Sequence, residues 1–415
     1  MSTSTVVAMA ALSAGAPLTK IDIELAPLAA DEVEIKITHC GVCASDHHLA
    51  AGHWGPWSVY PQVCGHEIVG TIAKAGPLVK GLAIGQRVGV GELWGKREKT
   101  LTIGYYILYL RPSTIKVYFY FIQSNPLLPS SPPPSPPHLH FRMGEFINFL
   151  FKIFTVSNHN PFSSYFQWKE ACEKCDICAA DCQAACDKSV PTCAGGNKGG
   201  FAEAIHVKYL YAHAIPDDLK SEHAAPLLCG GVTVYAPLVK HAPPSKTVGV
   251  VGLGGLGHLA VKFANARGNI VTVISGGESK KELALQLGAS RYIDMSNEEE
   301  LKAAADSLDF VLVTGTSAGF DHSLLLGLVK KLGTICYVAA QTENISVNPM
   351  GHLLSKHINV TGNTAGGHGS MRDMLRFAAA HKIAPMIELF PFADAQKALD
   401  GIQNNTTRFR GVLFM

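Results

Sequence analysis

Three glycines in the segment VVGLGGLGHLAVKFA constrain the fold more than any other feature of the chain. Gly252, Gly254 and Gly257 follow an apolar run that predicts a strand, and they open a stretch with helical spacing. The first glycine permits a tight turn, the second lets the backbone approach a pyrophosphate, and the third lets helix and strand pack closely. Free N–H groups at the start of such a helix favour an anion. The pattern predicts a dinucleotide-binding loop, against the alternative of a glycine-rich turn without a ligand.

Strands and helices alternate around this loop over residues 227–363. Short apolar runs such as NIVTVIS and DFVLVTG are separated by helical stretches such as KKELALQLG. This alternation predicts an α/β fold with a parallel, doubly wound Rossmann sheet. The further cofactor contacts predicted in this domain are Leu253, Gly255, Leu256 and Thr314.

The preceding part of the chain has a different pattern. DEVEIKITHCGV, EIVGTIAKAG and IGQRVGVGEL are short β-like runs separated by glycines within residues 31–94. They predict a partly antiparallel, barrel-like β domain. The first twenty residues predict a first strand rather than a secretory signal, because no basic residue precedes their apolar stretch. We assign residues 1–226 and 364–415 to this domain.

Residues from about 96 to 168 fit neither pattern. They contain the proline tract LPSSPPPSPPHLHF, aromatic runs such as VYFYF, and almost no Asp or Glu. Proline-rich sequence of this kind does not pack as a helix or a central strand. Two interpretations remain open: a true insertion or lid, and translated non-coding sequence such as a retained intron. We favour the second because the flanking motifs fit together without the segment.

The end of the strand after the glycine loop bears on the choice between NAD and NADP. An NAD-binding domain usually places Asp or Glu there to bind the ribose 2′-hydroxyl. This chain has Ser275 instead, followed by Ser279 and Lys280. Hydroxyl and ammonium groups suit a 2′-phosphate, so the sequence favours NADP(H). Glu278 is an opposing signal, and a solvated helix start is the alternative explanation for the lysine.

Four cysteines with metal-ligand spacing follow the anomalous segment. Four thiolates in a C-x2-C-x2-C-x7-C pattern can enclose one tetrahedral, structural Zn²⁺. A chain of 415 residues with no recognisable signal peptide favours metal over disulfides, although disulfides and idle thiols are the alternatives. Cys182 or Cys193 could replace the last cysteine as a ligand. The predicted ligands are Cys172, Cys175, Cys178 and Cys186.

A second set of possible ligands is dispersed along the chain. Cys43 lies in GVCASDHH, His66 in CGHEIVG and Cys229 in LLCGGVTVY. Three protein ligands with one open position are typical of a catalytic zinc. Each of these residues alone would more often be an ordinary core side chain. Their joint occurrence with a dinucleotide-binding fold is what predicts the site.

Together these motifs resemble the zinc-containing medium-chain dehydrogenases. Within that family, HCGVCASDHH, PLLCGGVTVYAPL and SKKELALQLGA resemble the cinnamyl alcohol dehydrogenase branch with its aldehyde reductases. The resemblance covers nearly all of the chain except residues from about 96 to 168. It implies a GroES-like catalytic domain beside the Rossmann domain, two Zn²⁺ per chain and a cytoplasmic homodimer. The implied activity is NADP(H)-dependent interconversion of primary alcohols and aldehydes.

The resemblance also implies roles around the catalytic zinc. Glu67 matches a carboxylate that enters the metal shell in some states, and Asp46 matches a partner that orients the imidazole of His66. Cys64 departs from the family, which commonly has proline at this position. The implied zinc ligands are Cys43, His66 and Cys229.

A proton relay is implied by two further residues. Ser45 matches a hydroxyl beside the zinc, and His48 matches an outer imidazole that passes protons toward solvent, which suits a group that titrates near neutrality. A surface histidine beside His47 is the alternative for His48. Thr233 matches a residue that packs on the nicotinamide.

The charge composition excludes some classes of binding partner. Lys and Arg number 35 against 33 Asp and Glu, a balance that predicts neither nucleic-acid nor membrane binding. The small-molecule substrate, an alcohol or aldehyde, is implied by the resemblance.

Other identities compete with the one that the resemblance implies. One is an inactive or mis-spliced family member. Another is an NAD-dependent zinc polyol or formaldehyde dehydrogenase. A zinc-free quinone reductase of the same superfamily would lack both cysteine sets.

Overall fold

The computed structural model describes residues 3–91, 171–317, 319–339 and 344–415, together with three strands between residues 105 and 141. The chain divides into two compact units, Met1–Lys96 with Tyr165–Met415, and Arg97–Ser164. In the second unit, β7 (Tyr105–Arg111), β8 (Thr114–Tyr120) and β9 (Leu139–Phe141) form an antiparallel sheet. The other predictions for the anomalous segment lie outside the described residues.

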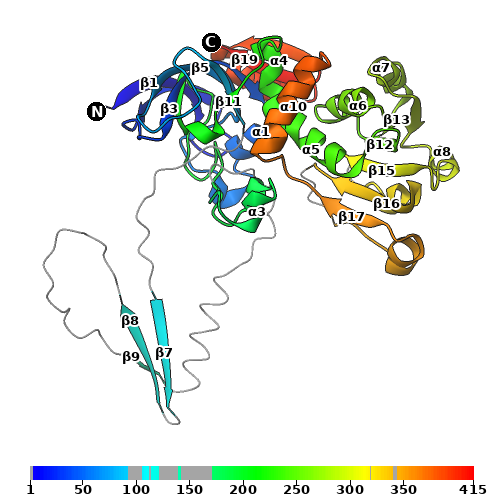
Figure 1. The fold of residues 1–415 in the computed structure, drawn as a ribbon, viewed down its shortest axis with the longest axis horizontal. Coiled ribbons are helices and arrows are strands. Elements are labelled where there is room, and N and C mark those ends of the chain that lie inside the picture. Colours follow the sequence, from blue (N-terminus) through cyan, green and yellow to red (C-terminus); the bar gives the residue numbers. More distant parts are fainter. Residues whose placement is uncertain are drawn as a thin grey trace, which may run out of the picture. The chain divides into compact units, whose positions relative to one another are not determined.

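The predicted doubly wound sheet is confirmed in the larger unit (Figure 1). Its strands lie in the order β14-β13-β12-β15-β16-β17, and every neighbouring pair is parallel. The order reverses between β12 and β15, where ligands of open α/β sheets bind outside the carboxyl ends of the strands. The strands are β12 (Thr247–Val251), β13 (Ile270–Ser275), β14 (Arg291–Asp294), β15 (Leu308–Val313), β16 (Val329–Tyr337) and β17 (Asn359–Gly362).

Both faces of this sheet are covered by apolar side chains, which explains the nearly continuous hydrophobic runs of its strands. Val248 and Val250 of β12 lie in a core with α5 and α6, whereas Val251 lies in a separate core with Leu325 of α9 and Leu301 of α8. The helices around the sheet are α5 (Val232–His241), α6 (Gly257–Ala266), α7 (Lys281–Gln286), α8 (Glu298–Ala303) and α9 (His322–Leu328), and α10 (His368–Ala380) packs on α5.

The β-rich part contains two further sheets, as its short alternating runs predict. One has the order β2-β1-β4, and the other has the order β11-β6-β5-β3-β19-β18 with β10 paired to β3. All its ladders are antiparallel except β18 with β19. The strands are β1 (Ser4–Ala11), β2 (Leu18–Leu25), β3 (Glu32–Val42), β4 (Gln62–Val63), β5 (Glu67–Ala75), β6 (Arg87–Val90), β10 (Ala204–Lys208), β11 (His213–Ala214), β18 (Ile387–Pro391) and β19 (Arg410–Phe414).

Short helices and turns connect the strands of both parts and carry many of the predicted site residues. In the described part of the chain, no helix is both long enough and apolar enough to cross a bilayer. The connecting elements are α1 (Ala44–Ala50), η1 (Gly55–Trp57), α3 (Asp176–Ala179), η3 (Gln183–Ala185), η4 (Tyr209–Tyr211), α4 (Ser221–Pro226), η5 (Leu227–Gly231), η6 (Glu278–Lys280), η7 (Pro349–Leu354), η8 (Phe392–Asp394) and α11 (Ala395–Gln403).

Candidate active site

The dispersed ligand set comes together in space. Cys43 precedes α1, His66 precedes β5, and Cys229 lies in η5, a π-helical turn between α4 and α5. The ligand atoms of these three residues and of Glu67 all lie within 4.8 Å of one another. His66 and Glu67 are fully buried. A π-turn is a frequent local distortion at functional sites, and here it carries the third ligand of the set.

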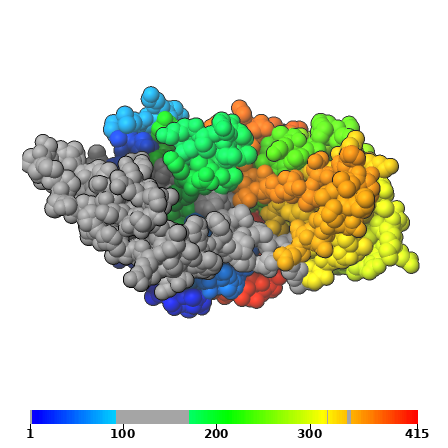
Figure 2. All heavy atoms as spheres, turned by 90° about the horizontal axis from the view of Figure 1, so that it is seen from below, coloured from blue at the N-terminus to red at the C-terminus, as the bar shows by residue number. Residues whose placement is uncertain are grey.

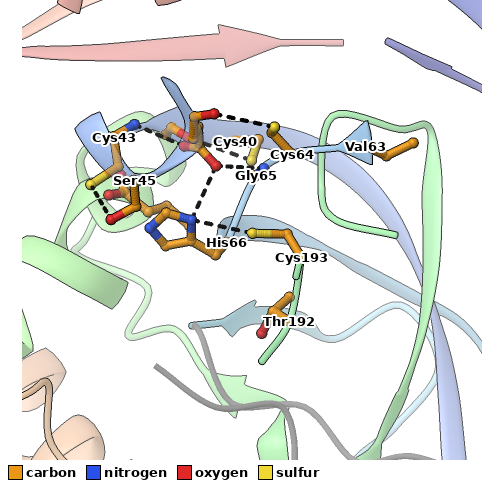
Figure 3. A network of polar contacts seen from close by, with 12 residues as sticks. Cys40, Cys43, Ser45, Val63, Cys64, Gly65, His66, Thr192 and Cys193 are labelled. Atoms are coloured by element: carbon orange, nitrogen blue, oxygen red, sulfur yellow. Dashed lines mark hydrogen bonds and ion pairs between the residues drawn. The ribbon is translucent and has the colours of Figure 1, made fainter. Parts of the chain in front are cut away.

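Asp46 fixes the imidazole of His66. Its fully buried carboxylate lies 3.1 Å from Nδ1 of His66, accepts a 2.8 Å hydrogen bond from the N–H of Gly65, and accepts one of 2.9 Å from the N–H of Cys43. A proton on Nδ1 satisfies this contact and leaves Nε2 as the nitrogen available to a metal. Figure 3 shows His66 between Cys43 and Ser45 on one side and Cys193 on the other. Sγ of Cys193 lies 3.7 Å from Nδ1 of His66, a contact that the sequence spacing does not indicate.

The chemistry of the set fits a divalent, thiophilic cation. A hydrogen bond from the Cys229 thiol holds the pKa of the Cys43 thiol well below its usual range. Oε2 of Glu67 is buried and has no hydrogen-bond partner among the described residues. A cation beside two sulfurs and an imidazole would satisfy that oxygen. Two thiolates, one imidazole and one position left open are the donors that a catalytic zinc takes.

Arg410 is a functional candidate that sequence reasoning missed. Its guanidinium is buried at the start of β19 and donates a hydrogen bond to Oε1 of Glu67. Burial raises the pKa of Glu67 to about 7, against the opposing effect of the Arg410 charge. A side chain added at Gly255 would come within 3.2 Å of the same guanidinium. Arg410 therefore lies between the glycine loop and the metal-ligand set.

The four-cysteine segment also comes together. Sγ of Cys175 lies 3.6 Å from that of Cys178 and 3.9 Å from that of Cys186, and the Cys172 and Cys178 sulfurs lie 3.9 Å apart. Four sulfurs about 2.3 Å from one zinc lie roughly 3.8 Å apart at tetrahedral angles. All eleven cysteines are described, and none forms a disulfide. Cys182 is exposed and bonds to a backbone carbonyl, so Cys186 is the fourth member of the cluster.

This cysteine lobe, residues 171–186, docks on the first turn of α10. The carboxylate of Asp181 accepts hydrogen bonds from the N–H groups of Gly369, at 2.8 Å, and Ser370, at 2.7 Å. Glu173 forms a 3.2 Å ion pair with His368. Figure 2 shows the lobe in green beside orange residues of this C-terminal region. Capping by Asp181 satisfies N–H groups that a helix start leaves without partners.

The glycine loop has the geometry that its sequence predicts. Gly252 has φ of 86°, a conformation that disfavours other residues. A side chain at Gly257 would overlap the carbonyl oxygen of Gly252, whereas one at Gly254 would meet nothing within 4 Å. The third glycine thus permits close helix packing and the second leaves open space for a ligand. Thr314 donates hydrogen bonds to the carbonyls of Val251 and Gly252, so it supports the turn.

The residues predicted to select NADP divide into two groups. Ser275 is buried, and its hydroxyl accepts a 3.2 Å hydrogen bond from the N–H of Leu253 in the glycine loop. Ser279 is exposed and Lys280 partly exposed in η6, after an exposed Gly276 and Gly277. The opposing residue, Glu278, is 65% exposed and pairs with Lys281 at 3.3 Å. This ion pair partly neutralises the carboxylate that would oppose a 2′-phosphate.

The predicted proton-relay residues lie on α1. Oγ of Ser45 is 3.7 Å from Sγ of Cys43, and His48 follows one turn later on the same helix. Nδ1 of His48 lies 3.0 Å from Nδ1 of His53, a residue that the sequence analysis did not select. Thr233 is buried in α5, shortly after Cys229.

Comparisons with known proteins agree with this geometry. Residues 29–107 match the family described as alcohol dehydrogenase GroES-like domain, and residues 255–380 match zinc-binding dehydrogenase. The probable cinnamyl alcohol dehydrogenase 8A of Oryza sativa subsp. japonica is 32% identical over 92% of this chain and 88% of its own. The NADP-dependent alcohol dehydrogenase C 1 of Mycolicibacterium smegmatis is 32% identical over 99% of this chain and 98% of its own.

Solved structures show the same fold. A cinnamyl alcohol dehydrogenase of Sorghum bicolor is similar with a TM-score of 0.76 and 29% identity, covering 99% of this chain and 98% of that chain. An enzyme of Helicobacter pylori described as CAD complexed with NADP(H) has a TM-score of 0.74 at 24% identity, over 100% of this chain and 99% of that one. The chain belongs to the zinc-containing medium-chain alcohol dehydrogenases, in the cinnamyl alcohol dehydrogenase branch.

Proposed function

We propose that this chain is a zinc-dependent alcohol dehydrogenase that transfers hydride reversibly between NADP(H) and a primary alcohol or aldehyde. The observation that carries the proposal is the meeting of Cys43, His66 and Cys229, three ligand residues from distant parts of the sequence, within 4.8 Å. Arg410 connects this set to the glycine loop, so a metal and a nucleotide would be held around one buried guanidinium. A cytoplasmic homodimer is part of the proposal and rests on the family resemblance.

Different residues of the chain would bind the metal and orient its ligands in such a reaction. When bound, Zn²⁺ supplies a Lewis acid for the substrate oxygen, and the nicotinamide supplies or accepts the hydride. Cys43, His66 and Cys229 would hold the ion, while Asp46 keeps the imidazole oriented. Glu67 offers a further carboxylate oxygen to the same space.

Proton movement falls to α1. Alcohol oxidation releases one proton at a buried oxygen, and aldehyde reduction consumes one there. The Ser45 hydroxyl lies beside Cys43, and His48 follows one helical turn later on α1. A hydroxyl followed by an imidazole can carry this proton near neutral pH.

The cofactor would be held by the glycine loop and selected after β13. The open space at Gly254 admits the pyrophosphate, and Ser279 with Lys280 offers a hydroxyl and a cation to a 2′-phosphate. The remaining proposed contacts are Gly252, Leu253, Gly255, Leu256, Gly257, Ser275 and Thr314, with Thr233 at the nicotinamide.

Metal analysis combined with a substrate panel tests the proposal. We expect about two Zn²⁺ per purified chain, and NADPH-dependent reduction of aromatic or aliphatic aldehydes. Cys43→Ala should abolish the reaction and leave NADPH binding intact. A preference for NADH with polyols or formaldehyde adducts would favour the competing zinc dehydrogenases. A folded protein that binds zinc and NADPH but reduces no aldehyde would favour an inactive family member.

A further inference from the structure

His53 lies in direct contact with the proposed relay histidine. The chain leaves α1 at Ala51 and turns at Gly52, whose φ is 76°. The N–H of His53 donates to the carbonyl of His48 at 3.0 Å, and the two Nδ1 atoms also lie 3.0 Å apart. Glycine permits this left-handed turn, and the turn brings the His53 ring back onto that of His48.

The hydrogen bond between the two rings constrains their protons. Two Nδ1 atoms at 3.0 Å form a hydrogen bond only when one carries a proton and the other does not. The pair therefore holds one proton between its Nδ1 atoms. His48 is partly buried, whereas His53 is exposed. The shared proton therefore lies between an inner imidazole, His48, and an outer one, His53.

We propose that His53 is the outer positioning residue of the proton relay, acting through the shared Nδ1 proton of a His48–His53 pair. This inference rests on the proposed function. In alcohol oxidation, His48 takes the substrate-derived proton on Nε2 and passes its Nδ1 proton to Nδ1 of His53. His53 then releases its own Nε2 proton to water, so one proton enters and one leaves. The pair is left with exchanged tautomers, which are those needed to carry a proton inward for aldehyde reduction.

The surroundings of the pair favour passing a proton on rather than holding a positive charge on His48. Burial lowers the pKa of His48, and the neighbouring His53 and His47 lower it further, whereas the Cys43 thiol raises it. The Trp54 ring stacks on His48 with centroids 5.3 Å apart. Burial and the neighbouring His53 also lower the pKa of His47, and Asp400 of α11 opposes this only in part. A positive charge on His48 is therefore disfavoured, so a proton that reaches His48 is passed on rather than held.

His47 provides a matched control. Its ring centroid lies 5.6 Å from that of His48, close to the 5.3 Å of His53, and it also repels a proton on His48. The hydrogen bond to His48, however, comes from His53. Replacing either residue removes a similar charge effect, and only replacing His53 removes the shared proton.

The test is the pH profile of kcat for alcohol oxidation by the zinc-loaded enzyme, with His53→Gln, His53→Ala and His47→Gln. For both His53 variants we expect kcat at pH 6 to fall about tenfold, with little change at pH 9, where solvent takes the proton directly. Added imidazole should restore His53→Ala. His47→Gln should change kcat less than twofold. Zinc content and NADPH affinity, measured in parallel, should match the wild type.

The outcomes separate the two proposals. A wild type without dehydrogenase activity would overturn the proposed function. An active wild type whose pH profile is superimposable on those of both His53 variants would overturn the role of His53 alone. An equal acidic loss in His47→Gln would also overturn it, because charge rather than the shared proton would then explain the effect.

Discussion

Arg410 and Glu67, separated by 343 residues in sequence, form a buried ion pair between the glycine loop and the proposed catalytic metal. Removing one partner of such a pair leaves an uncompensated buried charge, which typically costs about 3–5 kcal/mol. We therefore expect Glu67→Gln to lower the free energy of unfolding by about 3 kcal/mol in zinc-loaded protein, measured by urea denaturation.

The double variant Glu67→Gln with Arg410→Met controls for packing. It should be less destabilised than the sum of the two single variants, because neither charge is then left alone. Strict additivity of the two effects would show that the pair is not coupled.

Lys280 is expected to select NADPH. Lys280→Ala should raise KM for NADPH about tenfold, or about 1.4 kcal/mol, and leave KM for NADH nearly unchanged, because only NADPH carries the 2′-phosphate. The control is Lys281→Ala, since Lys281 is exposed and paired with Glu278. Steady-state kinetics with both cofactors measure the effect. Equal losses with NADPH and NADH would refute a phosphate contact.

His258 should make stability depend on pH. Burial lowers its pKa to about 3, and its ring contacts the Gly254 carbonyl and the N–H of Met386. The unfolded state binds a proton below the ordinary value of 6.5, whereas the folded state does so only near 3. Stability is therefore lost as pH falls from 6.5 toward 3, and the loss at pH 5 is about 2 kcal/mol.

Urea denaturation at pH 7 and pH 5 measures this loss. His258→Asn should lose about 2 kcal/mol less than the wild type between the two values, although it starts less stable at pH 7 because the hydrogen bonds of the ring are weakened. Identical pH dependence in the two proteins would contradict the effect assigned to His258.

Asp181 should anchor the cysteine lobe. Asp181→Asn retains a residue suited to φ of 58° but loses the carboxylate that binds Gly369 and Ser370. We expect a loss of about 1 kcal/mol in stability and faster release of one Zn²⁺ to a chelator. Asp187→Asn is the control, because Asp187 is exposed just after Cys186. Equal zinc-release rates for Asp181→Asn and wild type would contradict the docking role.

Motifs that combine local spacing with a required backbone geometry were predictable. The glycine loop and the four-cysteine pattern each lie within a few turns of chain, so sequence spacing reflects spatial proximity. No local pattern connects the dispersed ligands Cys43, His66 and Cys229, so they were predictable only from their joint occurrence with a dinucleotide-binding fold and from the family resemblance.

Other features depend on contacts that sequence spacing does not encode. Arg410 reaches Glu67 across 343 residues, and Cys193 reaches His66 across 127. His53 joins His48 because Gly52 turns the chain back, a signal that the run HHLAAGH contains but that we did not interpret. Ser275 was predicted as a contact for the ribose phosphate, and its hydroxyl already binds the backbone of Leu253.

Aldehyde-dependent oxidation of NADPH by metal-depleted protein, titrated with Zn²⁺, is the decisive measurement. With cinnamaldehyde as substrate, we expect no turnover in the depleted protein and full recovery when about two equivalents of zinc have been added. Cys43→Ala, which keeps the cysteine lobe intact, should remain inactive at every zinc concentration. Full activity in the zinc-free wild type, or in zinc-loaded Cys43→Ala, would contradict a catalytic zinc held by Cys43, His66 and Cys229.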